Sequence, residues 1–180
     1  TLIDARVGGI TASDRMAILG QVWNSDALAG LLKGAALHCY DFAGRGAAAI
    51  PAWMREHRIT YADGYPAMLR AIFSAADAPV PGLHRLMSNG EPLLKDDVET
   101  FEQIFPGADL VACYGSSEYI VMARYIHRHG APFPYASPPL GEPLDPEYFS
   151  LRGQDGGEVP PGVPGEVVMT SPIVMPGYHN

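Results

Sequence analysis

Short β-type segments alternate with helical segments between residues 35 and 113 of this 180-residue chain. The clearest helical segment spans residues 93–105, where apolar residues recur at helical spacing and charged residues fill the other positions. An alternating order of strands and helices predicts a parallel sheet with right-handed helical connections. We therefore expect an α/β fold, in which a mainly parallel sheet is flanked by helices.

The individual elements are predicted from local composition and spacing. The expected strands cover residues 35–40, 59–61, 83–87 and 109–113, and residues 119–128 favour a further strand. The expected helices cover residues 26–33, 47–57 and 93–105, with another that begins at Pro66 because proline suits the first helical turn.

The texture of the chain changes at residue 132, where proline and glycine become frequent. Two β-rich pieces follow, at residues 147–151 and 166–170, on either side of a turn-rich stretch. We expect them to pair as a small β-rich appendage. The predicted organisation is an α/β subdomain over residues 1–131 and a β-rich segment over residues 132–180 that begins the next subdomain.

Acidic residues outnumber basic ones by 20 to 12, which gives a formal net charge of −8. An acidic surface repels phosphate backbones and anionic lipids, so we expect neither a nucleic-acid partner nor a polybasic membrane contact. No apolar run approaches the roughly 18 residues that a membrane-spanning helix needs. The two distant cysteines, Cys39 and Cys113, do not form a disulfide framework, and such reduced thiols are typical of a cytoplasmic protein.

Two loops carry most of the side chains suited to chemistry, one at residues 88–93 and one at residues 114–118. One helix joins the strands before them, so both loops are expected to leave the carboxyl edge of the sheet, where open α/β sheets bind ligands. The loops offer two glycines for close backbone approach, an aromatic face, two hydroxyl donors for phosphate and a carboxylate for Mg²⁺. These residues are Gly90, Gly115, Tyr114, Ser116, Ser117 and Glu118. By residue type alone, the loops are also compatible with ordinary turns that carry a surface carboxylate.

Several segments resemble, in order, the motifs of the adenylate-forming enzyme superfamily. Residues 88–93 read SNGEPL and resemble its GGEPL loop, and residues 114–118 read YGSSE and resemble its YGxTE motif. Residues 155–162, 165–169 and 175–178 resemble the hairpin, the GE(I/L)xV segment and the GY pair that follow in the family. The superfamily includes acyl- and aryl-CoA synthetases and the adenylation domains of nonribosomal peptide synthetases. The resemblance covers nearly the whole chain.

The resemblance implies an ATP-dependent ligase that condenses a carboxylate with ATP to an acyl- or aminoacyl-adenylate and pyrophosphate. The acyl group would then pass to the thiol of coenzyme A or of a carrier-protein phosphopantetheine. Ser117 would contact phosphate and Glu118 would bind Mg²⁺, which offsets the repulsion between a carboxylate and a polyanion, so these two are the catalytic candidates. The implied ATP/AMP-binding residues, with Tyr114 opposite the Gly-Glu-Pro loop, are Gly90, Glu91, Pro92, Tyr114, Gly115 and Ser116.

The acyl-pocket positions of the family flank the same motifs and are mostly apolar in this sequence, which suits an aliphatic or aromatic acid. They are Met87, Asn89, Cys113, Val121 and Met122. Asn89 replaces the usual first glycine of the GGEPL loop and is expected to alter the floor of this pocket. Amino-acid-activating members hold the ammonium group with an aspartate near the start of the first helix. Asp26 lies near that position, and it equally suits the positive end of a helix dipole.

The sequence lacks the Ser/Thr/Gly-rich phosphate loop, the ribose-binding aspartate and the C-terminal catalytic lysine of the family pattern. We therefore expect a central part of a larger adenylating domain, inactive alone. Its expected partners are a small carboxylic or amino acid, the remaining subdomains, and a carrier protein if the acceptor is phosphopantetheine. The alternative is a non-catalytic α/β interaction module derived from the same fold. His127 and His129 would share a face if both lay on one strand, but no third metal ligand has suitable spacing.

Overall fold

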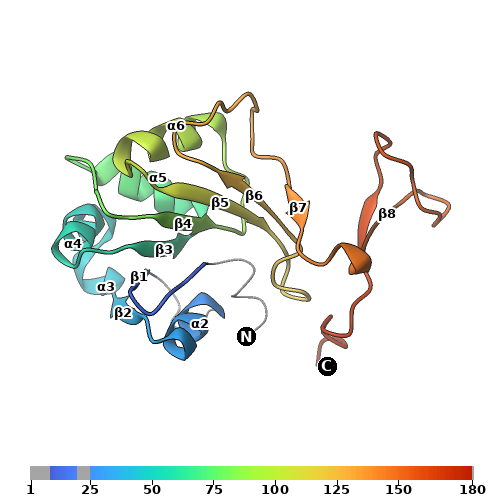
Figure 1. Cartoon of the computed structure of the whole chain (residues 1–180), viewed down its shortest axis with the longest axis horizontal. Coiled ribbons are helices and arrows are strands. Elements are labelled where there is room, and N and C mark those ends of the chain that lie inside the picture. The colour runs from blue at the N-terminus through green and yellow to red at the C-terminus, as the bar shows by residue number, and fades with distance from the viewer. Residues whose placement is uncertain (1–8, 20–24, 180) are drawn as a thin grey trace.

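Residues 9–19 and 25–179 are described by a computed structural model of the chain (Figure 1). Its main feature is a seven-stranded sheet with the order β2-β1-β3-β4-β5-β6-β7. Strands β1 to β5 run parallel to one another, whereas β6 and β7 are each antiparallel to the preceding strand. The expected α/β fold with a mainly parallel sheet is thus confirmed. The strands are β1 (Arg15–Ile18), β2 (Ala36–Cys39), β3 (Tyr61–Gly64), β4 (Arg85–Ser88), β5 (Asp109–Tyr114), β6 (Ala123–His127) and β7 (Glu142–Pro143).

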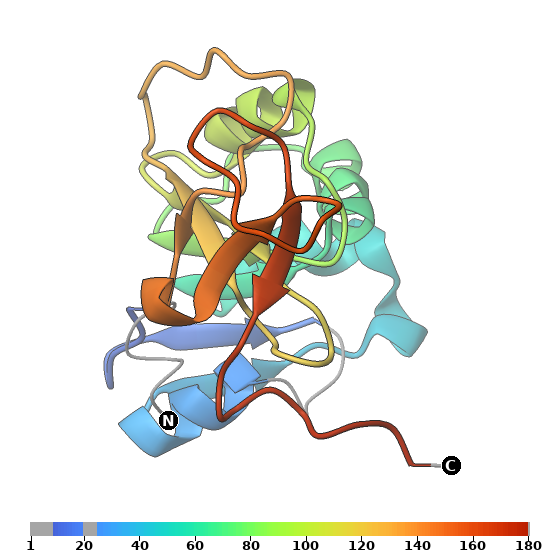
Figure 2. The same ribbon diagram turned by 90° about the vertical axis from the view of Figure 1, so that its right-hand side faces the viewer.

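Helices cover both faces of this sheet, with α2 on one face and α4, α5 and α6 on the other (Figures 1 and 2). None of the described helices has the length and hydropathy of a membrane-spanning segment. The helices are α2 (Ser25–Lys33), α3 (Phe42–Arg45), α4 (Ile50–Glu56), α5 (Pro66–Ala75) and α6 (Lys95–Ile104), with 3₁₀ turns at Ala47–Ala49 and Pro146–Tyr148.

Two hydrophobic cores lie on opposite faces of the sheet because successive strand side chains point to opposite sides. In β4, Leu86 belongs to the core under α4, α5 and α6, and Met87 belongs to the core under α2. In β5, Leu110 and Val111 divide in the same way. A parallel sheet must be buried on both faces, so the apolar strands predict this double cover. The same alternation decides which side chains meet at the carboxyl edge.

Most predicted elements are present, with small shifts at their ends. β3 runs from Tyr61 to Gly64, whereas the sequence predicted a strand at residues 59–61. Three short elements, β1, α3 and β7, were not predicted. β1 is largely buried between β2 and β3 and pairs with both, so its neighbours rather than its four residues define it.

The β-rich appendage is present as a separate antiparallel pair, β8 (Phe149–Arg152) and β9 (Glu166–Met169). This pair stands to one side of the large sheet (Figure 1). The Tyr119 hydroxyl donates to Asp145 at 3.1 Å, and the Met175 amide donates to the Glu118 carbonyl at 2.9 Å. Both bonds connect the appendage region to the loop after β5. Because β7 joins the large sheet, residues 132–180 contribute to both sheets, and the boundary at residue 132 stays a prediction.

Candidate functional site

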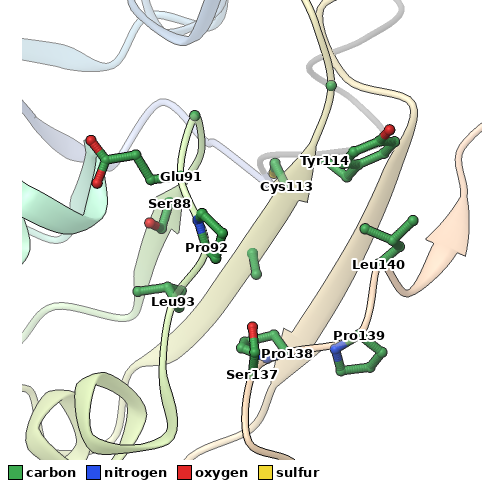
Figure 3. A pocket seen from close by; sticks show the side chains of 13 residues that line it. Ser88, Glu91, Pro92, Leu93, Cys113, Tyr114, Ser137, Pro138, Pro139 and Leu140 are labelled. Atoms are coloured by element: carbon green, nitrogen blue, oxygen red, sulfur yellow. The ribbon is translucent and has the colours of Figure 1, made fainter.

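The two loops selected from the sequence meet at the carboxyl edge of the parallel strands. β4 and β5 are parallel neighbours, with Ser88 opposite Ala112, so their following loops lie side by side. Together with a third segment they surround a pocket of about 370 Å³ (Figure 3). The lining residues are 88 at the end of β4 and 90–93 after it, 112–114 at the end of β5 and 115 after it, and 137–140 before β7.

The walls of this pocket are mostly apolar. Pro92 and Leu93 lie on one side, and Tyr114 and Leu140 lie on the opposite side (Figure 3). Residues 137–139 close the pocket along a third side (Figure 3). A concave site with flat apolar walls and few polar groups suits a planar ring. Of the predicted nucleotide-binding residues, the pocket brings together Gly90, Glu91, Pro92, Tyr114 and Gly115.

The third wall belongs to a segment that we call the strap, residues 129–141, which sequence reasoning missed as part of the site. The Lys95 amide at the start of α6 donates to the Ala136 carbonyl at 2.9 Å. At the other end of the strap, Glu102 accepts hydrogen bonds from the Gly130 amide at 2.7 Å and from His127 Nε2 at 3.0 Å. His127 is thus a buried structural residue, 2% exposed. These bonds fix the strap against α6.

Aromatic rings add a second anchor to the strap. The rings of Phe133 and Tyr135 lie 5.5 Å apart, and both contact Tyr125 of β6, at 6.2 and 6.0 Å between ring centroids. The usable sequence signal was this pair of aromatic residues just before two consecutive prolines. The crowding of proline there predicted only the start of the appendage.

The structure explains why residue 115 is glycine, which the sequence alone did not. A Cβ atom at this position would lie 1.6 Å from the carbonyl oxygen of Ile120, so the turn after β5 closes only with glycine. Gly90 has a φ of +84° with open space around its Cα, which suits both a turn and a nearby ligand. Ile120 itself adopts a φ of +67°, an unusual conformation for a β-branched residue. Strained backbone of this kind clusters at binding sites.

Ser116, Ser117 and Glu118 follow directly in the same loop but do not line the pocket. Ser117 is exposed, and Glu118 is half-buried. Hydrogen bonds from Ser116 and Tyr178 hold the pKa of Glu118 below its usual range. Glu118 therefore carries an ionised carboxylate in the loop just after the pocket residues, and a carboxylate of this kind is an oxygen donor suited to Mg²⁺. Among the described residues, no cluster of three or more acidic, histidine or cysteine side chains is suited to a metal. Substrate phosphates and water would have to complete such a site.

Four of the five predicted acyl-pocket residues lie on the other face of the sheet edge, under α2. Met87, Cys113 and Val121 belong to the core on that face. Asn89 is exposed, and its side-chain amide donates to Asp63 of β3 at 3.0 Å. Met122 is not among the residues of that core, and its backbone amide donates to the Tyr114 carbonyl at 2.7 Å. The structure thus brings four of the five candidates to one region.

Two carboxylates, Asp26 and Asp63, accompany these residues, and the sequence did not single out Asp63. The Tyr61 hydroxyl donates to Asp26 at 3.0 Å, and Asp26 is only 8% exposed. Burial and the nearby charge of Asp26 raise the pKa of Asp63 to about 7. Burial, then the charges of Asp26 and Asp63, raise the pKa of the Cys113 thiol to about 12. This region is negatively charged. A ligand that brings positive charge or hydrogen-bond donors would relieve the repulsion between Asp26 and Asp63.

Comparison with known proteins gives one family and several partial relatives. The profile of a family described as "AMP-binding enzyme" matches residues 16–179. Bacitracin synthase 2 of Bacillus licheniformis is 30% identical over 125 residues, which is 69% of this chain and 5% of that protein. A feruloyl-CoA synthase of an Amycolatopsis species is 29% identical over 154 residues, which is 82% of this chain and 30% of that protein.

The crystal structure of VinN has a similar fold, with a TM-score of 0.77 and 25% identity. The alignment covers 98% of this chain and 44% of VinN, and a second structure holds VinN in complex with L-aspartate. The chain therefore spans less than half the length of each of these three proteins.

Proposed function

This chain belongs to the family of AMP-binding enzymes, and on that premise we propose that it forms the nucleotide-binding part of an ATP-dependent ligase. In the proposed reaction a carboxylate oxygen attacks the α-phosphorus of ATP, an acyl-adenylate forms and pyrophosphate leaves. The acyl group then passes to a thiol, either of coenzyme A or of a carrier-protein phosphopantetheine. The pocket between the β4 loop, the end of β5 and the strap is the observation that carries this proposal.

The nucleobase occupies this pocket in our proposal. The backbone of residues 90–92 forms one wall and the ring of Tyr114 forms the other. Tyr114 is 37% exposed without a ligand, so a stacked base would remove apolar ring surface from water. The strap adds Pro138 and Pro139 as a further wall of the same pocket.

The phosphates lie along the loop after β5 in our proposal, where Ser117 offers a hydroxyl donor and the hydroxyl of the neighbouring Ser116 donates to Glu118. Glu118 would hold Mg²⁺, which when bound offsets the negative charge of the phosphates as the carboxylate approaches. The lowered pKa of Glu118 supports this role, because a protonated carboxyl is a poor magnesium ligand.

We propose that the activated acid carries an amino group. Asp26 and Asp63 concentrate negative charge beside Met87, Asn89 and Cys113, and an ammonium group would stabilise the ionised form of both carboxylates. The complex of VinN with L-aspartate supports an amino acid as the substrate class. The apolar side chains of this region then contact the rest of the acid.

We further propose that catalysis needs parts of a longer protein outside these 180 residues. By itself, the chain would bind nucleotide but would not catalyse the reaction. Its small share of each relative supports this view. The outer face of α2 also exposes Leu28, Leu31 and Leu32, at 53%, 61% and 64%, and such a surface suits another part of a longer protein. A cytoplasmic location stays a proposal that rests on the low cysteine count and the reduced thiols.

Acid-dependent exchange between ATP and pyrophosphate tests the proposed reaction, in a protein that contains this chain with its flanking regions. We expect exchange with a pool of amino acids and less with aryl or fatty acids. Glu118→Gln should abolish exchange, and Asp63→Asn should reduce it for amino acids alone. Asp96→Asn, an exposed change on α6, is the matched control. A folded protein that exchanges with none of these pools would instead favour the non-catalytic interaction module.

A further inference from the structure

Glu118 and Tyr178 lie 60 residues apart in the sequence and meet in the folded chain. The Tyr178 hydroxyl donates to Glu118 Oε1 at 2.5 Å. The Met175 amide donates to the backbone carbonyl of the same Glu118 at 2.9 Å. The segment after β9 therefore touches the loop after β5 through both backbone and side chain.

Apolar burial does not explain the position of Tyr178. Its side chain is 72% exposed, one of the most exposed large side chains among the described residues. A tyrosine whose ring is held in place by hydrophobic packing would have that ring buried away from water. The specific feature of this contact is the hydroxyl, which donates to a carboxylate and so forms one of the stronger kinds of hydrogen bond.

Glu118 has acceptor capacity left for a ligand. A carboxylate has about four acceptor positions, and Ser116 and Tyr178 each donate to this one. The backbone amide of Glu118 is a third donor, so about one position is left for a metal ion, on a group whose rotation these donors already restrict. A preorganised ligand binds a metal with less loss of side-chain entropy than a freely rotating one.

We propose that Tyr178 is a positioning residue that orients the carboxylate of Glu118 toward the metal of a bound metal–nucleotide complex. This inference rests on the proposed function and adds a residue to its phosphate end. Tyr178 touches neither nucleotide nor metal in this arrangement, so it acts only through Glu118. Removal of the hydroxyl should weaken metal–nucleotide binding about three- to tenfold, the net worth of one ordinary hydrogen bond.

The test uses the 180-residue chain with Mn²⁺·ATP as the probe, because Mn²⁺ replaces Mg²⁺ and is visible by electron paramagnetic resonance. The variants are Tyr178→Phe, Glu118→Gln and the double variant. Tyr178→Phe keeps the exposed ring and removes only the hydroxyl, so its fold is preserved. The matched control is Tyr65→Phe, because Tyr65 is 47% exposed at the start of α5 and follows β3, not the loop that carries Glu118.

A second readout is independent of nucleotide. The chain is labelled with ¹³C at the tyrosine ring carbon that bears the hydroxyl, and its NMR spectrum is recorded. The Tyr178 signal is the one that is missing from the spectrum of Tyr178→Phe. The hydrogen bond to Glu118 raises the pKa of Tyr178 above that of a free tyrosine. Glu118→Gln should return this titration toward the ordinary value, and Tyr65→Phe should leave it unchanged.

Support requires three results together. The Tyr178 titration responds to Glu118→Gln, Tyr178→Phe weakens Mn²⁺·ATP binding, and the same change has no effect in the Glu118→Gln background. A titration that ignores Glu118→Gln overturns the contact, and unchanged Mn²⁺·ATP affinity in Tyr178→Phe overturns its role. Wild-type chain that shows the titration coupling but binds no Mn²⁺·ATP overturns the proposed function and the inference with it.

Discussion

At the residue scale, Asp63 has the most unusual chemistry of the side chains at the sheet edge. It follows Tyr61 by two positions in β3, so strand alternation directs both side chains to the α2 face. Asp26 reaches the same region from the start of α2, where it accepts the Tyr61 hydroxyl. Two carboxylates that share one partly buried region do not both ionise without cost. A proton therefore resides on Asp63 in much of the population near neutral pH.

This proton makes the stability of the chain depend on pH in a specific direction. The pKa of Asp63 rises from 3.8 to about 7 on folding, so the folded chain binds the proton more tightly than the unfolded chain. The Asp63 contribution to the free energy of unfolding is therefore full below pH 4 and decreases as the pH rises toward 7. We expect a decrease of roughly 2 kcal/mol over this range, allowing for solvent at the half-buried carboxylate.

Urea unfolding of the wild type and of Asp63→Asn at a series of pH values measures this dependence. The variant should lose the Asp63 part of the slope, because asparagine does not titrate. Asp96→Asn, an exposed change, should keep the wild-type slope. Parallel pH profiles for wild type and Asp63→Asn would mean that Asp63 titrates alike in the folded and unfolded chain.

At the element scale, α6 ties the walls of the pocket together at its first turn. The Asp97 carboxylate accepts the Leu94 amide at 2.8 Å, which satisfies one of the free amides at the start of this helix. The same carboxylate accepts two hydrogen bonds from Arg70 of α5, at 2.9 and 2.7 Å. The Lys95 amide meanwhile holds the strap. Burial alone would raise the pKa of Asp97, but the bonds from Arg70 and Leu94 hold it below its usual range.

Asp97→Ala should lower the free energy of unfolding by about 2 kcal/mol, because it removes a helix cap and leaves Arg70 without its partner. Asp96→Ala, one residue earlier and exposed, should change it by less than about 0.5 kcal/mol. Urea midpoints at an unchanged denaturant slope give both values. Equal effects at the two positions would show that the general charge of the helix start, and not the specific cap, stabilises α6.

The alternation of strands and helices, and the meeting of residues 88–93 with residues 114–118, were predictable because periodicity and chain order are local signals. β1 was not, since a four-residue strand is defined by its partners β2 and β3. The strap was also missed, because it has no repeating pattern and takes its place from contacts with α6. Asp63 escaped notice because the predicted strand stopped at Tyr61, two residues before it.

At the scale of the whole molecule, the two sheets differ in how far helices cover them. The seven-stranded sheet is covered by helices on both faces, whereas no α-helix of residues 9–19 and 25–179 packs on the β8–β9 pair (Figures 1 and 2). A two-stranded sheet alone is marginal in water, so this pair depends on its contacts with the loop after β5. Local stability should therefore differ strongly between the two sheets.

Hydrogen exchange followed by mass spectrometry should show this difference. Amides of β4 and β5 should exchange slowest, and amides of β8 and β9 should exchange at least about 100-fold faster, because they open without global unfolding. Peptides from α6 provide an internal reference for the main core. Equal protection in both sheets would show that the chain unfolds as a single cooperative unit.

The 60-residue separation of Glu118 and Tyr178 has a consequence for the order of events during synthesis. A ribosome adds roughly 5–20 residues each second, so Tyr178 emerges roughly 3–12 s after Glu118. Every residue that lines the pocket lies at or before position 140 and has been made by then. In a nascent chain, all residues of the pocket walls are therefore present several seconds before Tyr178 is available to donate its hydrogen bond to Glu118. The carboxylate end of the site is therefore completed after the walls of the pocket.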